Sequence, residues 1–306
     1  MFTHLLVPLD GSALAESALP AASFFGERCG ASVTLIHVVE DNPPTAIHGE
    51  HHLKSRTEAE EYLRDAASRY FDRKLKVDCH VHTMVEAGVA QAITHHQAEF
   101  DHDLIVMCTH GRTGANNLVF GSIAQKIAAL GTVPVLIVRP DRSNVPAPAF
   151  AVTPMLVPLD GSQEHDPGLA AAEELARRVN GEIHLLLVVP TLATIPGQWE
   201  DSTKILPTST GRMLEMAAEE AASYLEAQRL AVATLGIPVS TELDRGEPAK
   251  VIAECAERQN SQLVVFATHG RAGMEAIWEG SVASRALSRV TVPVLLIPLA
   301  KQESSR

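Results

Sequence analysis

The sequence has few of the features that mark secreted, membrane-spanning or metal-stapled proteins. Only 4 of its 306 residues are cysteine, and none forms a CxxC pair, which argues against a disulfide framework and a zinc ribbon. No apolar run approaches the length of a membrane span, and the N-terminus leads directly into a strand-like run rather than a targeting signal. We therefore expect reduced thiols, a cytoplasmic location and no membrane partner.

Positive charge is also scarce. The chain has 25 Lys and Arg against 37 Asp and Glu, a formal net charge of -12, and the acidic residues are spread along both halves. Because a phosphate backbone needs a clustered basic face, we expect no nucleic-acid partner. Apolar residues make up 46% of the chain, so a globular fold is expected. A single small anion can still be held by a nest of backbone amides.

An internal repeat indicates the domain organisation. The segment "LLVPLDGS" at 5–12 returns as "MLVPLDGS" at 155–162, and "TVPVLIVRP" at 132–140 returns as "TVPVLLIPL" at 291–299. A duplicated unit of about 150 residues explains both matches and agrees with ordinary domain sizes. We predict a first domain at 1–142, a proline-containing linker at 143–152, a second domain at 153–300 and a tail at 301–306.

Within each copy, short runs rich in Val, Ile and Leu alternate with longer stretches at helical spacing. Strands buried on both faces form continuous apolar runs, so each copy predicts an open parallel sheet with helices on both faces, an α/β fold. The first copy predicts strands at 4–9, 32–39, 76–84, 104–108 and 134–138, with helices at 13–28, 56–72, 88–98 and 122–130. The second predicts strands at 155–159, 182–189, 238–243, 262–267 and 293–297, with a long helix at 211–234. Ser12 is expected to cap the first helix, Pro20 to kink it and Gly30 to end it.

A glycine-rich loop follows the fourth predicted strand of each copy. It is "THGRTGANNLVFGS" at 109–122 and "THGRAGMEAIWEGS" at 268–281. Glycines let backbone amides point inward, and the helix that begins at Gly121 and Ser122 adds its partial positive charge, so the loop suits a phosphate. If the first and fourth strands are neighbours, Asp10 faces the same crevice and fits ribose hydroxyls or an exocyclic amine. Ordinary turn chemistry is the alternative interpretation.

These loops resemble the ATP-binding motif of the universal stress protein family, in its tandem two-domain form. The motif is a glycine, two residues, a second glycine, nine residues, and then Gly-Ser or Gly-Thr. The resemblance implies two Rossmann-like, adenine nucleotide alpha hydrolase-like sheets of strand order 3-2-1-4-5, joined as an internal pseudo-dimer through their closing strands. It also implies an adenine nucleotide as partner, ATP with or without Mg²⁺, and a role in the stress response. A further homodimer is a second expectation.

Carried over position by position, the resemblance implies a nucleotide site in each copy. Adenosine would contact Asp10 and the backbone of Val38 in the first copy, and phosphates would contact the loop and helix start. The implied first-copy residues are Asp10, Val38, Cys108, His110, Gly111, Arg112, Gly121, Ser122 and Ile123. The second-copy residues are Asp160, Val188, Ala267, His269, Gly270, Arg271, Gly280, Ser281 and Val282.

The sequence departs from the motif in ways that keep other functions open. Cys108 and Ala267 replace the first glycine of the motif, and Glu279 places a carboxylate directly before Gly280, so the first copy is the favoured site. Neither loop has the lysine of a P-loop, and no catalytic residue is assigned. A nucleotide-free scaffold and a slow ATPase are therefore the alternatives to a nucleotide-binding regulatory protein. Histidine clusters at 48–52, 80–82 and 95–96 are interpreted as solvated surface, and no metal site is predicted.

Overall fold

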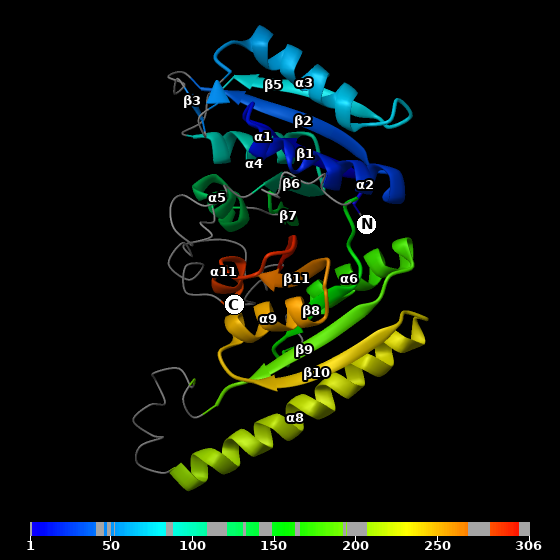
Figure 1. Ribbon diagram of the computed structural model, residues 1–306, viewed down its shortest axis with the longest axis vertical. Coiled ribbons are helices and arrows are strands. Elements are labelled where there is room, and N and C mark those ends of the chain that lie inside the picture. The colour runs from blue at the N-terminus through cyan, green and yellow to red at the C-terminus, as the bar shows by residue number, and fades with distance from the viewer. Residues whose placement is uncertain are drawn as a thin grey trace, which may run out of the picture. The chain divides into compact units, whose positions relative to one another are not determined.

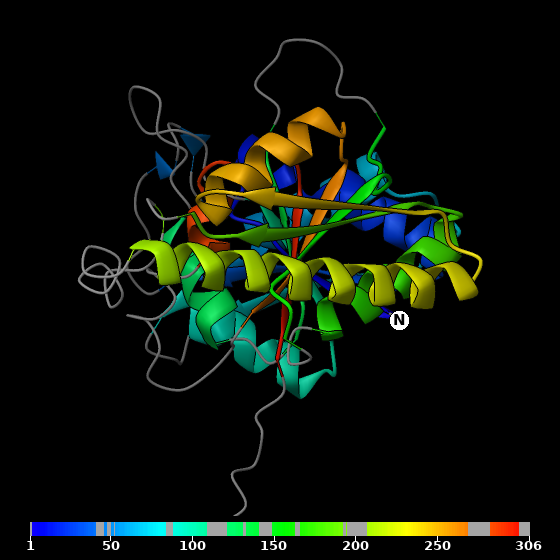
Figure 2. The same cartoon turned by 90° about the horizontal axis from the view of Figure 1, so that it is seen from below.

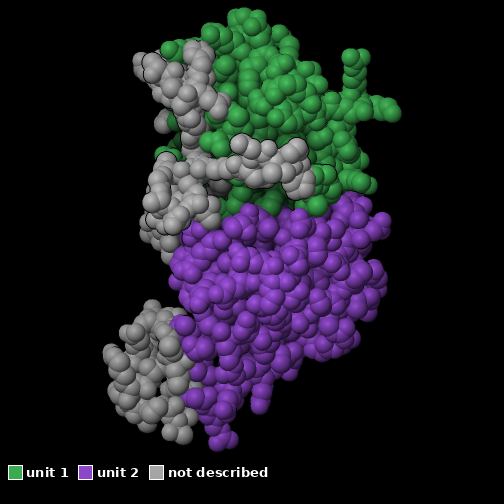
Figure 3. Space-filling model, viewed as in Figure 1, with its two compact units in different colours: residues 1–151, 268–276, 293–306 green, residues 152–267, 277–292 purple. Residues whose placement is uncertain are grey.

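The protein is described by a computed structural model that divides into two compact units. The first unit contains residues 1–151, 268–276 and 293–306, and the second contains 152–267 and 277–292 (Figure 3). The structure describes residues 2–40, 46–47, 50–51, 53–83, 88–108, 121–130, 133–140, 149–162, 166–191, 194, 207–268 and 282–299. The predicted domain limits stay a prediction, because the compact units are not contiguous in sequence.

The first unit is built on a parallel sheet. Its strands are β1 (His4–Pro8), β2 (Ser32–Val39), β5 (Val77–Thr83), β6 (Leu104–Cys108) and β7 (Val135–Val138). They lie side by side in the order β5-β2-β1-β6-β7, which is the 3-2-1-4-5 order expected for the first copy. Every residue of β6 and β7 is buried, as the continuous apolar runs predicted. The strand β12 (Val294–Pro298) pairs antiparallel with β7.

Helices cover both faces of this sheet. They are α1 (Ala13–Glu16), α2 (Leu19–Cys29), α3 (Arg56–Tyr70), α4 (Val89–Glu99) and α5 (Ser122–Leu130). Helix α2 packs against α3, and α4 packs against α5 (Figure 1). Right-handed crossovers place the first pair on one face and the second pair on the other. Two short strands, β3 (Ala46–Ile47) and β4 (Glu50–His51), form a separate antiparallel pair.

The first predicted helix is broken rather than kinked. Helix α1 ends at Glu16, and α2 starts again at Leu19 with Pro20 in its first turn. Proline is tolerated there because the backbone N–H groups of a first turn have no intrahelical partner. Helix α2 then ends on Gly30 at a φ of 71°, as predicted for a left-handed C-terminal turn.

The second unit repeats the plan. Its strands are β8 (Met155–Leu159), β9 (Ile183–Val189), β10 (Val239–Arg245) and β11 (Leu263–Thr268), in the order β10-β9-β8-β11. Its helices are α6 (Asp166–Val179), α8 (Pro207–Thr234), α9 (Pro248–Arg258) and α11 (Val282–Leu287). The long α8 packs along β9 and β10 (Figure 2), and α9 packs against α11.

The expected fifth strand of the second sheet, β12, falls in the first compact unit, so the division into two sheets of five strands stays a prediction. None of the four cysteines, all of which lie in the described residues, is part of a disulfide. Within the described helices, none combines the length and the apolar character that crossing a bilayer requires.

Candidate functional site

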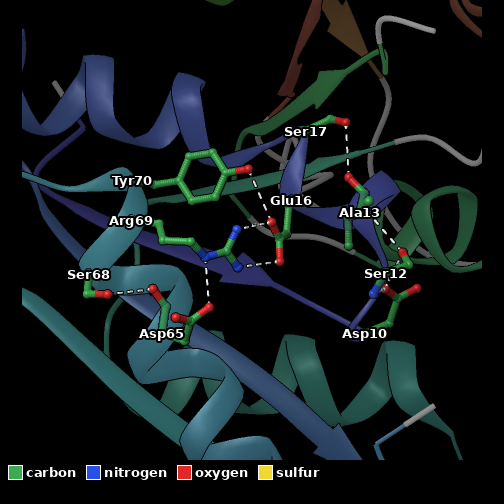
Figure 4. A network of polar contacts seen from close by, with 10 residues as sticks. Asp10, Ser12, Ala13, Glu16, Ser17, Asp65, Ser68, Arg69 and Tyr70 are labelled. Atoms are coloured by element: carbon green, nitrogen blue, oxygen red, sulfur yellow. Dashed lines mark hydrogen bonds and ion pairs between the residues drawn. The ribbon is translucent and has the colours of Figure 1, made fainter. Parts of the chain in front are cut away.

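The Asp-Gly-Ser turn after β1 fixes the direction of the Asp10 carboxylate. Gly11 has a φ of 91°, a left-handed conformation that glycine adopts without a Cβ clash. The backbone N–H and the hydroxyl of Ser12 donate to Asp10 Oδ1 at 2.9 and 2.6 Å (Figure 4). Ser12 Oγ in turn accepts from the N–H of Ala15 at 3.2 Å and caps α1, as predicted. One turn therefore orients the carboxylate and begins the helix.

Strand β2 supports this turn from the adjacent position in the sheet. The N–H of Leu9 donates to the carbonyl of Ile36 at 2.9 Å, and His37 Nδ1 lies 2.8 Å from the carbonyl oxygen of Leu9. His37 is 1% exposed and precedes the buried Val38. Asp10 and Val38 thus lie at the carboxyl ends of neighbouring parallel strands. His37 was not predicted as a site residue, although a histidine inside the apolar run "VTLIHVV" was a usable signal.

The ends of the neighbouring strands β6 and β7 bring a thiol and a guanidinium to the same edge of the sheet. Burial, with a smaller contribution from the Asp10 charge, raises the pKa of Cys108 to about 12. Burial lowers the pKa of Arg139, which directly follows β7, to about 10. At neutral pH the thiol is therefore neutral and the guanidinium charged. Arg139 was not predicted as a site residue, although a cation directly after a buried strand was a usable signal. Pro298 occupies the matching position in the second copy.

The start of α5 is the described part of the predicted phosphate site. Gly121 is buried, Ser122 is exposed at the first helical position, and Ile123 is half-buried. The N–H of Gln125 donates to the carbonyl of Gly121 at 3.0 Å. The other predicted loop residues lie outside the described residues: His110, Gly111, Arg112, His269, Gly270, Arg271, Gly280 and Ser281.

The second unit repeats the turn in a more open form. Gly161 has a φ of 84°, and the N–H of Ser162 donates to Asp160 Oδ1 at 2.9 Å. Asp160 is exposed, whereas Asp10 is half-buried. Of the other predicted residues here, Val188, Ala267 and Val282 are half-buried. The local geometry is therefore copied, but the carboxylate is less enclosed.

A polar network holds α1 against α3. The carboxylate of Glu16 accepts two hydrogen bonds from the guanidinium of Arg69, at 2.9 and 2.8 Å, and one from Tyr70 Oη at 3.1 Å (Figure 4). Arg69 Nε also donates to Asp65 at 2.7 Å. Because α1 begins directly after the Asp10 turn, this network restrains the turn as well. None of these residues was singled out from the sequence.

Two stretches of the chain, residues 1–139 and 152–298, each match the sequence profile of the Universal stress protein family. The chain belongs to the universal stress protein family. The double match confirms the resemblance and the tandem two-domain form.

Two relatives and one solved structure support this assignment. The chain is 26% identical over 304 residues to a universal stress protein of Mycolicibacterium smegmatis, with 96% of each chain covered. A universal stress protein of Methanocaldococcus jannaschii is 28% identical over 149 residues, covering 49% of this chain and 84% of the relative. The crystal structure of a universal stress protein from Archaeoglobus fulgidus matches with a TM-score of 0.69 at 17% identity, covering 98% of this chain and 97% of that one. The last match confirms the α/β fold.

This universal stress protein also has a histidine cluster in its first unit. His80 on β5 lies 5.1 Å from His96 on α4, between ring centroids, and the His82 and His102 rings lie 6.0 and 5.6 Å from His96. His96 and His102 are only 3% and 1% exposed, so the solvated-surface interpretation is wrong for His96, whereas the adjacent His95 is exposed. Burial, reinforced by neighbouring rings, lowers the pKa of both to about 4. A cleft of about 550 Å³ opens beside the cluster.

Proposed function

We propose that this universal stress protein binds an adenine nucleotide, ATP with or without Mg²⁺, and acts as a regulatory protein of the stress response rather than as an enzyme. The observation that carries the proposal is the arrangement of Asp10, Val38 and the end of β6 at the carboxyl ends of three adjacent parallel strands. In open α/β sheets this edge, where the strand order reverses, is where ligands bind. Family membership supports the same assignment.

The chemistry of the donors and acceptors fits a nucleotide. Both hydrogen bonds that Asp10 accepts from the described residues go to Oδ1, so Oδ2 can accept from ribose hydroxyls or an adenine amine. The start of α5 offers the Ser122 hydroxyl and the N–H groups of a helix N-terminus to a phosphate. The charge of Arg139 favours an anion at the same edge of the sheet.

We propose the first copy as the occupied site. Asp160 is exposed where Asp10 is half-buried, so a hydrogen bond to Asp160 competes more directly with water. The second copy also has Pro298 in place of Arg139 and therefore lacks that cation in its repeat. The alternative to this proposal is that both copies bind a nucleotide.

An interaction protein without nucleotide is the second candidate. Helix α8 exposes Met213, Met216 and Leu230, each more than half exposed, at 57%, 56% and 51%. Apolar side chains on the open face of a long helix are typical of a surface that meets another protein. A slow ATPase is the third candidate.

One experiment separates these candidates. The purified chain is denatured, any released nucleotide is identified by mass analysis, and the ligand-free protein is titrated with ATP by calorimetry with and without Mg²⁺. We expect one ATP per chain. If no nucleotide co-purifies and millimolar ATP gives no heat, the interaction protein without nucleotide is the candidate that remains. Phosphate release that is lost in Asp10→Ala would favour the ATPase.

The assembly and location are also proposals. We propose an internal pseudo-dimer of the two domains, a further homodimer of the whole chain, and a cytoplasmic location. Light scattering behind gel filtration measures the mass of the particle, and a monomer mass of 32.8 kDa over a range of concentrations would rule out the homodimer.

A further inference from the structure

A histidine, a glutamate and a cysteine converge on one point in the second unit. His184 comes from β9, Glu242 from β10 and Cys255 from α9. One nitrogen, oxygen or sulfur atom of each lies within 4.8 Å of those of the other two. His184 Nε2 is 3.4 Å from Glu242 Oε2, and Cys255 Sγ is 3.9 Å from the same oxygen. Among the residues that the structure describes, no other cluster brings three such ligand atoms this close.

Rigid secondary structure positions all three side chains. His184 is opposite Ser240 in the parallel pairing of β9 and β10, and Glu242 lies two residues further along β10, on the same face. Helix α9 packs on these two strands and brings in Cys255, which is fully buried. Since every ligand comes from a helix or strand, the cluster needs no loop rearrangement to form.

The ring of His184 is oriented for a ligand. Its Nδ1 lies 2.8 Å from Ser240 Oγ, which fixes the ring and directs Nε2 towards Glu242 and Cys255. The residue is 6% exposed, and its buried Nε2 lies 3.4 Å from Glu242 Oε2. Metal-bound histidines characteristically use one nitrogen for the ion and the other for a supporting hydrogen bond.

We propose that His184 Nε2, Glu242 Oε2 and Cys255 Sγ bind a zinc ion or a similar divalent transition metal. Ordinary Zn–N and Zn–O bond lengths and a tetrahedral angle place the nitrogen and oxygen about 3.4 Å apart, and the sulfur and oxygen about 3.6 Å apart. The present separations are 3.4 and 3.9 Å. A water molecule would complete the tetrahedron through the exposed side of Glu242, whose side chain is 24% exposed.

The surrounding contacts are compatible with an ion. The guanidinium of Arg258 binds Oε1 of Glu242, which leaves Oε2 facing the histidine and the thiol. Gln259 Nε2 donates to Oε2 over 3.3 Å, and an ion at this oxygen would replace that contact. Binding converts the thiol of Cys255 to a thiolate and releases its proton to water, while the metal–sulfur bond forms with no change of oxidation state.

The metal site is separate from the proposed nucleotide site. His184 precedes Val188 by four residues on β9, a separation of about 13 Å along an extended strand. The site thus lies near the amino ends of the strands, and its existence does not depend on nucleotide binding.

The experiment compares metal binding by the full chain and by two variants. Protein stripped with a chelator is titrated with Co²⁺ and with Zn²⁺, and bound metal is measured by elemental analysis. The unmodified chain should bind one equivalent and give the near-ultraviolet charge-transfer band of a cobalt–thiolate bond. Cys255→Ser should abolish that band and weaken Zn²⁺ binding at least about tenfold. Replacing residues that only hydrogen-bond to metal ligands already lowers metal affinity by about that factor. Cys79 is a half-buried thiol in the first unit, and Cys79→Ser should leave the charge-transfer band and the Zn²⁺ affinity unchanged.

The outcomes are distinguishable even if a substitution weakens the fold. Urea unfolding without metal reports the stability of each variant, and added Zn²⁺ should raise the unfolding midpoint of the unmodified chain but not of Cys255→Ser. A cobalt complex without the thiolate band would assign the metal to other residues, such as the histidine cluster, and overturn the proposal. Absence of stoichiometric metal would show that the triad is a hydrogen-bonded polar cluster only.

Discussion

Replacing Asp10 with asparagine tests the proposed nucleotide site with the smallest change of shape. Asparagine keeps an oxygen that can accept from the N–H and hydroxyl of Ser12, so the turn that starts α1 should survive. It replaces Oδ2 with an amide NH₂ group and removes the negative charge. An adenine amine would then face a donor instead of an acceptor, and a ribose hydroxyl would lose a charged partner.

The expected loss follows from the hydrogen bond that disappears. A hydrogen bond to a charged group contributes about 1.5–3 kcal/mol, which corresponds to about a 10- to 150-fold weaker affinity. Asp10 is half-buried, so its bond to a ligand is partly shielded from competing water. The unfolding midpoint in urea should stay close to that of the unmodified chain, because both turn contacts use Oδ1.

The assay is calorimetric titration of ATP into the unmodified chain, Asp10→Asn and Asp160→Asn. The last variant makes the same change in the matching turn of the second unit, where the carboxylate is exposed. We expect Asp160→Asn to bind one ATP as the unmodified chain does. Unchanged affinity in Asp10→Asn would refute the role of this carboxylate, and equal losses in both variants would refute the preference for the first copy.

Three further predictions concern stability, each measured by urea unfolding. Glu16→Gln should lower the unfolding free energy by about 1 kcal/mol, because it removes the charge that pairs with Arg69, and water weakens this ion pair at the 44% exposed Arg69 side chain. An unchanged unfolding free energy would mean that the network does not stabilise the fold. Because the pKa of His96 is lowered to about 4, the unfolded chain binds more protons between pH 6.5 and 4, so the unfolding free energy should fall as the pH drops through that window. His96→Leu should flatten that pH dependence, and an unchanged slope would contradict the assignment. Gly161→Ala should lower the unfolding free energy by about 1–2 kcal/mol, because alanine is strained at the Gly161 φ of 84°. Gly211→Ala should leave the unfolding free energy unchanged or raise it, because Gly211 lies inside the helix α8, where alanine is favoured over glycine.

Most of the fold was predictable because buried parallel strands and the repeat are strong signals. The runs "TLIHVV" and "LIVMC" lie in β2 and β6, whose limits are those expected, 32–39 and 104–108. The break at Pro20 was underestimated, since proline can equally kink one helix or begin the next. The pairing of the closing strands was expected, and β12 does pair antiparallel with β7. That β12 belongs to the first compact unit was not expected, because sequence periodicity does not show which core a closing strand joins.

The candidate site was predictable where one motif contains the residues and unpredictable where the fold assembles them. Asp10 and Ser12 are two residues apart, and their turn formed as expected. His37 and Arg139 are more than a hundred residues apart in sequence, and only the strand order brings them to the same edge of the sheet. The zinc ligands are a stronger case: His184 and Glu242 have no local motif, and the register of β9 with β10 makes them neighbours.

The two copies keep the same turn backbone while the surroundings of its carboxylate differ. Both turns keep the glycine with positive φ and the Asp-to-Ser hydrogen bond, because these contacts also determine how the chain leaves the first strand. Burial of the carboxylate and the cation at the position of Arg139 are not needed for that turn, and both differ in the second copy. Retained turn geometry is therefore poor evidence for a second nucleotide. A stoichiometry of two ATP per chain would show that neither carboxylate burial nor Arg139 determines binding.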